Sequence, residues 1–192
     1  MISVIIATYG DEWIANHQSE IQWALRSASE QSFKAVEVIR IHRDTLHEAR
    51  NSGAKQAKGH RLVFLDGDDW LEPNFCRKIV ESEDVLQPLT KYSEGPNTGI
   101  ATMPSYLEPR DDLLDGNHLI VGCPVKREMF LDVGGFDDWP VYEDWALWLK
   151  MRKAGATFGR TTGIYNVRYS FMGRNQDYRG PHIYNEIRRA YA

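Results

Sequence analysis

Cysteine is scarce in this sequence of 192 residues, which contains only Cys76 and Cys123. Their spacing matches no metal-binding or redox motif, so we expect neither a disulfide framework nor a cysteine-ligated metal. Thiols without such a motif are typical of buried residues in a reducing compartment. A large excess of charge of one sign is also missing, because the formal net charge is only −4. Proteins built mainly to hold nucleic acid usually carry a basic excess, so the sequence does not indicate that class.

Long hydrophobic runs are missing as well. No apolar stretch approaches the length of a membrane-spanning helix. The N-terminal stretch MISVIIATYG is too short for a secretory signal peptide and lacks the basic region with which one begins. These absences predict a soluble, cytoplasmic protein without a membrane span.

Apolar residues nevertheless make up 42% of the sequence and aromatic residues 11%, which is enough for a packed core. In the first 80 residues, short apolar runs alternate with stretches of helical periodicity. This pattern predicts strands at 3–8, 36–41 and 61–65, and helices at about 16–30 and 47–58. The alternation is typical of an α/β protein with a mostly parallel central sheet flanked by helices. In such sheets, ligands bind at the carboxyl ends of the strands.

The pattern after the third predicted strand is less regular. Residues 83–117 contain several prolines and at most a strand at 99–104. Clearer signals predict a helix from Pro73 to about Ser82, a strand at 118–122, a helix at 143–154, a strand at 164–169 and a helical tail from Pro181.

The strand at 61–65 runs directly into three carboxylates, Asp66, Asp68 and Asp69, in the stretch RLVFLDGDDW. Neighbouring carboxylates raise one another's pKa unless a cation or a hydrogen-bond donor lies between them. A hard divalent cation relieves this repulsion and commonly binds one or two carboxylates together with phosphate oxygens. The alternative is a solvated turn whose aspartate caps the next helix, and Asp69 fits it. For Asp68 we favour a metal ligand, because three carboxylates exceed what one cap needs.

Three blocks of the sequence resemble, in order, the signature blocks of the family 2 glycosyltransferases with the GT-A fold. They are SVIIATYG, ARNSGAKQAKGHRLVFLDGDDWLEP and VGGFDDWPVYEDWALWLKMRKAGA. The resemblance implies a nucleotide-diphosphate sugar donor, Mn²⁺ or Mg²⁺ as cofactor, a hydroxyl acceptor and inversion at the anomeric carbon. It also implies a single GT-A-like domain, 1–192, with a nucleotide-binding half at about 1–82, an acceptor and catalytic half at about 99–170 and a C-terminal tail at 171–192.

On the nucleotide side, the resemblance assigns roles to four residues. Thr8 and Tyr9 match the turn that packs against the nucleotide base. Arg50 and Asn51 match the family's ARN motif. We expect this motif to open a helix on the donor side, since helix N-termini attract phosphate.

The resemblance also assigns roles to three aspartates. Asp66 and Asp68 match the family's Asp-x-Asp motif, in which Asp68 would bind the metal and Asp66 would face the ribose or the donor sugar. Asp144, in the stretch YEDWALWL, matches the catalytic base.

The residues after Asp144 support an inward-facing carboxylate. Leu147, Trp148 and Met151 follow it by three, four and seven positions, so the carboxylate shares a helix face with apolar residues. Shielding from water tends to raise its pKa, and the helix N-terminus opposes that shift. A base placed there would take the proton of an acceptor hydroxyl as its oxygen attacks. An ordinary first-turn acid is the alternative for both Glu143 and Asp144.

The sequence departs from the family pattern at several positions. Gly10 stands where the first turn usually ends in asparagine, and the second strand ends in IHRDT instead of paired acids. Asp44 is our candidate for contact with the base, although His42 occupies the more literal position. The late segment RYSFMGR contains no histidine, so His182 is the candidate for the metal or diphosphate, with a surface histidine as the alternative. Trp139 is the candidate platform for the acceptor.

Other functions stay open at this point. A non-catalytic or degenerate nucleotide-sugar-binding or carbohydrate-binding protein would keep the fold without transfer. A sugar-nucleotide nucleotidyltransferase would need a glycine-rich basic loop after the first strand, whereas ATYGDEWIAN has one glycine and two acids. Within the enzyme class, a retaining transferase would differ in the anomeric configuration of its product. A nucleic acid is not indicated as the acceptor but not excluded, and a homo-oligomer also stays open.

Overall fold

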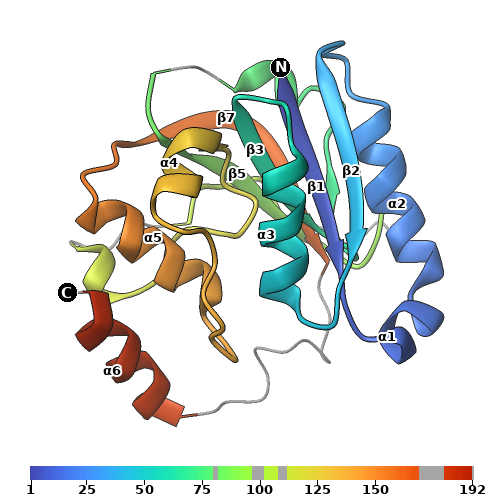
Figure 1. Ribbon diagram of the computed structural model, residues 1–192. Coiled ribbons are helices and arrows are strands. Elements are labelled where there is room, and N and C mark those ends of the chain that lie inside the picture. The colour runs from blue at the N-terminus through green and yellow to red at the C-terminus, as the bar shows by residue number, and fades with distance from the viewer. Residues whose placement is uncertain (80–81, 97–101, 108–111, 169–179, 192) are drawn as a thin grey trace.

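The computed structural model describes residues 1–79, 82–96, 102–107, 112–168 and 180–191. These residues form one seven-stranded sheet in the order β2-β1-β3-β6-β5-β7-β4, with helices packed around it (Figure 1). The strands are β1 (Ile2–Thr8), β2 (Val36–His42), β3 (Arg61–Asp66), β4 (Trp70–Leu71), β5 (Val85–Ser93), β6 (Val125–Lys126) and β7 (Phe158–Arg168). The helices are α1 (Asp11–Asn16), α2 (Gln18–Ser29), α3 (Leu46–Gln56), α4 (Arg127–Asp132), α5 (Glu143–Lys153) and α6 (Gly180–Tyr191), with one-turn 3₁₀ helices η1 (Cys76–Lys78) and η2 (Leu113–Asp115).

The first half of the sheet is parallel. β1 lies between β2 and β3 and pairs with both in the parallel sense. Every residue of β1 is buried, as its continuous apolar run predicts for a strand covered on both faces. The register places Thr8 beside His42 and Ala7 beside Asp66, so the three strands end at one edge. The predicted α/β class is confirmed.

The second half of the sheet is mixed. β5 and β7 pair in parallel, whereas the two-residue strands β4 and β6 pair antiparallel with their neighbours. β6 joins the halves by pairing with both β3 and β5. The expectation of a mostly parallel sheet therefore holds only loosely, and a mixed sheet describes the molecule better.

Helices cover both faces of the parallel strands. Adjacent residues of a strand point to opposite faces, and accordingly Ile5 packs in one core cluster with Ala49 of α3, whereas Ile6 packs in another with Ala24 of α2. At Gly53 of α3, an added Cβ would lie 2.5 Å from Ile5 Cγ2, so glycine permits the close approach of α3 to β1. In the described ranges, no helix is long and apolar enough to cross a membrane.

Two predicted elements differ from the structure. Residues 118–122 form an irregular segment and a turn instead of a strand. Over residues 73–79 of the helix expected from Pro73 to Ser82, the structure has turns and the short η1 instead, and residues 80–81 lie outside the described residues. Leu119 and Val121 are buried in the first segment, and Phe75 and Cys76 are buried in the second. Burial of a few apolar residues does not by itself distinguish a regular element from an irregular segment.

One strand was not predicted. β5 lies within residues 83–117, for which the several prolines predict less regular structure, and Pro88 stands inside the strand. The register between β5 and β7 shifts between Gln87 and Leu89, since proline has no N–H to donate to the neighbouring strand. Of the strand considered at 99–104, residues 99–101 lie outside the described residues, and the rest has no regular structure.

Candidate active site

The acidic turn follows β3 at the carboxyl edge of the parallel strands. Asp66 ends β3, and the Asp69 N–H donates to its carbonyl at 3.1 Å, which closes the turn. The buried Asp69 carboxylate accepts from the Arg168 backbone N–H at 2.8 Å and from the Tyr165 hydroxyl. Asp69 therefore ties the turn to β7, and the interpretation of this residue as a helix cap is wrong. Asp68, between the two, is partly exposed.

The carboxylates of this turn oppose one another electrostatically. Burial raises the pKa of Asp68, and the charge of Asp66 raises it further. Burial, together with the charges of Asp68 and Asp66, raises the pKa of Asp69 well above its usual range. A cation at Asp68 would offset this repulsion, so the oxygen donors suit Mn²⁺ or Mg²⁺. Within the described part of the chain, no group of three or more His, Cys, Asp and Glu side chains could hold a metal ion, so a cation here would need phosphate or water as further ligands.

Arg50 of α3 joins the acidic turn to α5. Its side chain is only 2% exposed, and its Nη2 donates to Asp66 Oδ1 at 2.7 Å while its Nη1 donates to Glu143 Oε1 at 2.8 Å. The guanidinium also lies over the Phe136 ring, 5.0 Å from the centroid, which adds a cation–π contact. Arg50 therefore binds carboxylates from two different elements and sets their separation.

Arg50 and Asn51 do not open a helix, so that prediction is wrong. α3 begins at Leu46 after Thr45, whose side chain caps the helix, and both residues lie in its second turn. The Asn51 amide exchanges two hydrogen bonds with the backbone of Phe136, at 2.8 and 2.9 Å. The two side chains thus hold α3 against α5 and the loop that precedes it.

The two acidic residues at the start of α5 have different surroundings. Glu143 pairs with Arg50 and lines a pocket. The Asp144 carboxylate accepts from the Trp145 N–H at 2.7 Å and hydrogen-bonds to the Asn117 side chain. Burial, reinforced by the charge of Glu143, raises the pKa of Asp144 to about 7. A carboxyl group with this pKa exchanges its proton near neutral pH, as a general base does.

A pocket of about 170 Å³ contains residues from both halves of the sequence. It is lined by Tyr9, Asp44, Thr45, Leu46, His47, Asp138, Trp139, Pro140 and Glu143. The sequence had suggested Tyr9 and Asp44 for the nucleotide and Trp139 for the acceptor, and the pocket brings the three together. No local signal could have found this, because the loop before α5 reaches the strand ends only through the tertiary fold.

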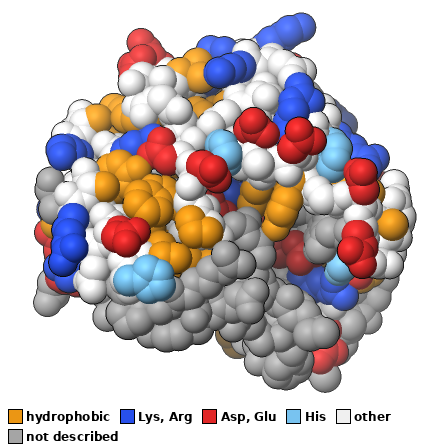
Figure 2. Space-filling view, turned by 60° about the horizontal axis from the view of Figure 1, so that its bottom comes forward, with side chains coloured by type: hydrophobic (Ala, Val, Ile, Leu, Met, Phe, Trp, Pro, Cys, Tyr) orange, Lys and Arg blue, Asp and Glu red, His pale blue; other side chains and the backbone are white. Residues whose placement is uncertain are grey.

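Thr8 and His182 are the remaining predicted site residues, and neither lines this pocket. Thr8 is buried, and its hydroxyl donates to the Ile41 carbonyl at 3.3 Å, inside the sheet. His182 is exposed on α6, which packs against α5, and its role at a metal stays a prediction. The side of the molecule toward which β2 runs comes forward in Figure 2, where acidic side chains lie among histidines and exposed apolar groups.

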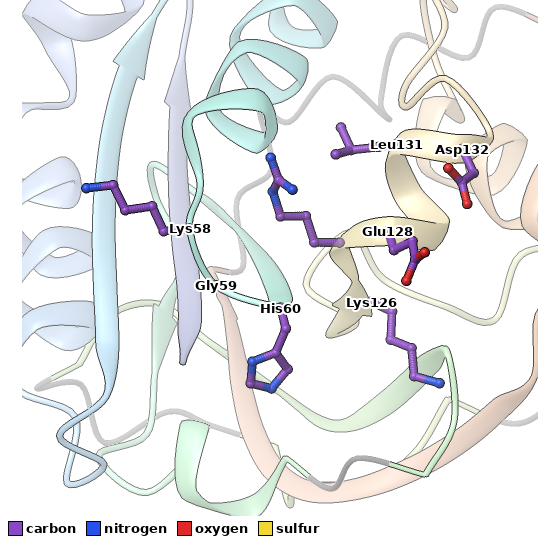
Figure 3. A pocket seen from close by; sticks show the side chains of 8 residues that line it. Lys58, Gly59, His60, Lys126, Glu128, Leu131 and Asp132 are labelled. Carbon is purple, nitrogen blue, oxygen red and sulfur yellow. The ribbon is translucent and has the colours of Figure 1, made fainter.

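A larger pocket, of about 620 Å³, lies at the opposite end of β3. Lys58, Gly59 and His60 precede that strand and line the pocket together with residues of β6 and α4, so β3, roughly 17 Å long, separates it from the acidic turn. The side chains of Lys58, His60 and Lys126 point in different directions (Figure 3). Ligand sites usually contain polar groups that converge, so the carboxyl edge is the better candidate.

Comparisons of the sequence with known proteins find glycosyltransferases. Residues 23–85 match the model of glycosyl transferase family 2, and this segment contains Arg50, Asn51 and the acidic turn. An uncharacterized glycosyltransferase of Haemophilus influenzae is 28% identical, with 70% of this chain and 56% of that protein covered. The chain therefore spans just over half the length of this relative.

Solved structures of Staphylococcus aureus TarS are similar in fold. The complex of TarS 1–349 with UDP-GlcNAc has a TM-score of 0.65 at 17% identity, covering 97% of this chain and 64% of that one. The complex with UDP has a TM-score of 0.60 at 17% identity, covering 97% and 62%. The chain thus resembles the family 2 glycosyltransferases in sequence over residues 23–85 and has a GT-A fold over almost its whole length.

Proposed function

We propose that this protein is a glycosyltransferase, which moves a sugar from a nucleoside-diphosphate donor to an acceptor hydroxyl with inversion at the anomeric carbon. The observation that carries the proposal is the double ion pair of Arg50, at the edge where three parallel strands end. Through this side chain the proposed nucleotide-binding half, about 1–82, meets the proposed catalytic half, about 99–170. The donor would lie on one side of Arg50 and the base on the other.

The proposed donor site includes Tyr9 and Asp44, which line the pocket at this edge. Asp66, fixed by its bond to Arg50, would face the ribose or the donor sugar. The TarS complexes contain UDP-GlcNAc and UDP, so UDP-sugars are the first donors to test.

Asp68 is the proposed ligand of Mn²⁺ or Mg²⁺, with His182 as a second candidate. When bound, such an ion stabilises the negative charge that develops on the leaving diphosphate. Burial and the charge of Asp66 raise the pKa of Asp68, and a bound cation would offset this shift by favouring the ionised carboxylate.

Asp144 is the proposed general base. Its carboxylate takes the proton of the acceptor hydroxyl while the acceptor oxygen forms a bond to the anomeric carbon. The bond from that carbon to the phosphate oxygen breaks, and its electron pair leaves with the nucleoside diphosphate. Glu143 is the weaker candidate, because its carboxylate is bound to Arg50 and a neighbouring cation favours the ionised form over protonation.

A donor screen followed by a transfer assay tests the proposal. Thermal unfolding is measured with a panel of nucleotide sugars in Mn²⁺ and in EDTA, since a ligand at a hundred times its Kd adds about 2.7 kcal/mol of stability. Donors that stabilise the protein are then incubated with hydroxyl acceptors, and the anomeric configuration of the product is read by NMR. An inverted product supports the proposal, and a retained configuration contradicts inversion. Tight donor binding without transfer or donor hydrolysis would favour a non-catalytic binding protein.

A further inference from the structure

The C-terminal helix α6 packs against α5 by one apolar face. Ile183 and Ile187 are buried in the core, and Tyr184 stacks on Trp145 of α5 with ring centroids 4.1 Å apart. Tyr191, the last residue of α6, follows Ile187 by four positions, so it lies on the same face of the helix. This packing fixes where the Tyr191 side chain meets the rest of the molecule.

Tyr191 contacts the loop between α4 and α5. Its hydroxyl accepts from Trp139 Nε1 at 3.0 Å and donates to the Asp137 carboxylate. Asp137 in turn pairs with Lys150 of α5 at 2.9 Å, and the Lys150 ammonium donates to the Gly135 carbonyl at 2.5 Å. In this network of Tyr191, Trp139, Asp137 and Lys150, each of these donors has an acceptor. The network therefore holds the loop in one conformation.

The contact between Tyr191 and Trp139 has two further supports. Their rings meet edge to face with centroids 6.4 Å apart, an arrangement that aromatic pairs favour. Burial, together with the hydrogen bond to Asp137, raises the pKa of Tyr191 to about 12. The hydroxyl therefore keeps its proton at neutral pH and continues to donate to Asp137.

Trp139 lines the pocket at the carboxyl edge together with Tyr9 and Asp44. It is partly buried, so one part of the indole packs against protein while another faces the pocket. Within the described residues, the indole N–H donates its hydrogen bond to the Tyr191 hydroxyl. The rotamer of this pocket wall thus depends on a helix that does not line the pocket.

We propose that Tyr191 is a positioning residue, whose hydroxyl holds Trp139 as a wall of the pocket and thereby sets the affinity for the donor nucleotide. Because Trp139 shares this pocket with Tyr9 and Asp44, the proposal assigns it to the donor side and not to the acceptor side expected from the sequence. The identity of the ligand rests on the proposed function, whereas the control of Trp139 rests on the contacts of Tyr191 alone. An indole already held in one rotamer loses little freedom when a ligand binds against it. Without the hydroxyl, binding would have to order the side chain.

Tyr191→Phe is the direct test, because it keeps the ring and removes only the hydroxyl. Trp139→Phe removes the indole N–H that Tyr191 binds, and the double variant completes the cycle. Tyr106→Phe is the matched control, since the Tyr106 hydroxyl donates to the Thr161 carbonyl at 3.1 Å and the residue does not line the pocket. UDP binding in Mn²⁺ is measured by calorimetry, and exchange of the Trp139 indole proton by ¹⁵N NMR. Melting temperatures verify that every variant is folded.

Tyr191→Phe is expected to weaken UDP binding by about two- to tenfold, the effect of one net hydrogen bond, and to speed exchange of the indole proton. The double variant should bind UDP no more weakly than Trp139→Phe, because both changes break the same contact. The control should match the wild type in both measurements. Unchanged indole exchange in Tyr191→Phe, or additive losses in the double variant, would overturn the proposal. The wild type could also bind no nucleotide while Tyr191→Phe still speeds exchange of the indole proton. This result would reject the proposed function and the nucleotide role of Trp139. The positioning of Trp139 by Tyr191 would stand.

Discussion

Arg50 and Glu143 lie 93 positions apart in the sequence and form an ion pair with 2.8 Å between Nη1 and Oε1. The guanidinium is buried, and the Glu143 side chain is 16% exposed. The same guanidinium binds Asp66 at 2.7 Å. The Asp66 side chain is 35% exposed. Removal of Arg50 would therefore leave the largely buried Glu143 carboxylate and the partly exposed Asp66 carboxylate without their cation, which is more costly than the loss of a surface pair.

Arg50→Ala should lower the free energy of unfolding by about 3–5 kcal/mol, the range found when one partner of a buried pair is removed. Urea denaturation measures this change. Arg26→Ala is the control, because the pair of Arg26 with Glu30 is largely exposed and should change stability by less than about 0.5 kcal/mol. If both variants lost equally little, Arg50 would not connect the two halves energetically.

Asp68→Asn should abolish the dependence of nucleotide binding on Mn²⁺ while the protein stays folded. The amide is close in size to the carboxylate but lacks the negative charge that attracts a hard cation. Calorimetric titration with UDP in Mn²⁺ and in EDTA measures the effect. Asp132→Asn serves as the control, since Asp132 is exposed on α4 at the larger pocket. Equal UDP affinity of the wild type in Mn²⁺ and in EDTA would contradict the metal assignment.

Asp144→Asn should reduce the transfer rate by about 10²–10⁴-fold, the usual contribution of a positioned base, and leave donor affinity unchanged. Turnover and donor Kd are measured on one preparation. Near-normal turnover of this variant, combined with a large loss in Glu143→Gln, would move the base to Glu143. Lost donor binding would instead place Asp144 on the nucleotide side.

The transfer rate of the wild type should fall as the pH is lowered through about 7. A base must be ionised to accept a proton, and the pKa of Asp144 is raised to about 7. The measurement is the pH profile of kcat at saturating donor. A rate that stays level between pH 5 and 8 would exclude a base with this pKa.

The pH dependence of stability offers a test that needs no substrate. Between the unfolded pKa of an aspartate, about 3.9, and the folded pKa of about 7, the folded protein holds a proton on Asp144 that the unfolded chain has released. Stability from this group therefore declines as the pH rises through that window. Asp144→Asn should remove this part of the decline in urea denaturation curves at pH 4 to 8. Parallel curves for the variant and the wild type would show that the pKa is not raised.

Local patterns predicted much of the fold. The strands β1, β2 and β3 and the helices α2, α3 and α5 were visible because apolar periodicity acts within one element. The apolar face expected for α5 is confirmed by the burial of Leu147, Trp148 and Met151. β5 was missed because Pro88 breaks its local pattern, although pairing with β7 continues on both sides of the shift.

The chemical character of the site was visible in the sequence, but its connections were not. The carboxylates after β3 and the acid pair at the start of α5 were both identified from the sequence. The partner of Arg50 could not be identified, since neither spacing nor composition tells which carboxylates a buried arginine will meet. The interpretation of Asp69 as a cap failed for the same reason, because its partners, Tyr165 and Arg168, lie on a distant strand.

The sequence by itself determined the α/β class, the acidic end of the third strand and the acidic start of α5. Only the tertiary structure decided that Arg50 joins Asp66 to Glu143 and that Trp139 shares a pocket with Tyr9. The physical reason is the range over which each determinant acts. Periodicity and capping act over a few neighbouring residues, whereas these contacts form only when α3 and α5 pack in one core with the sheet.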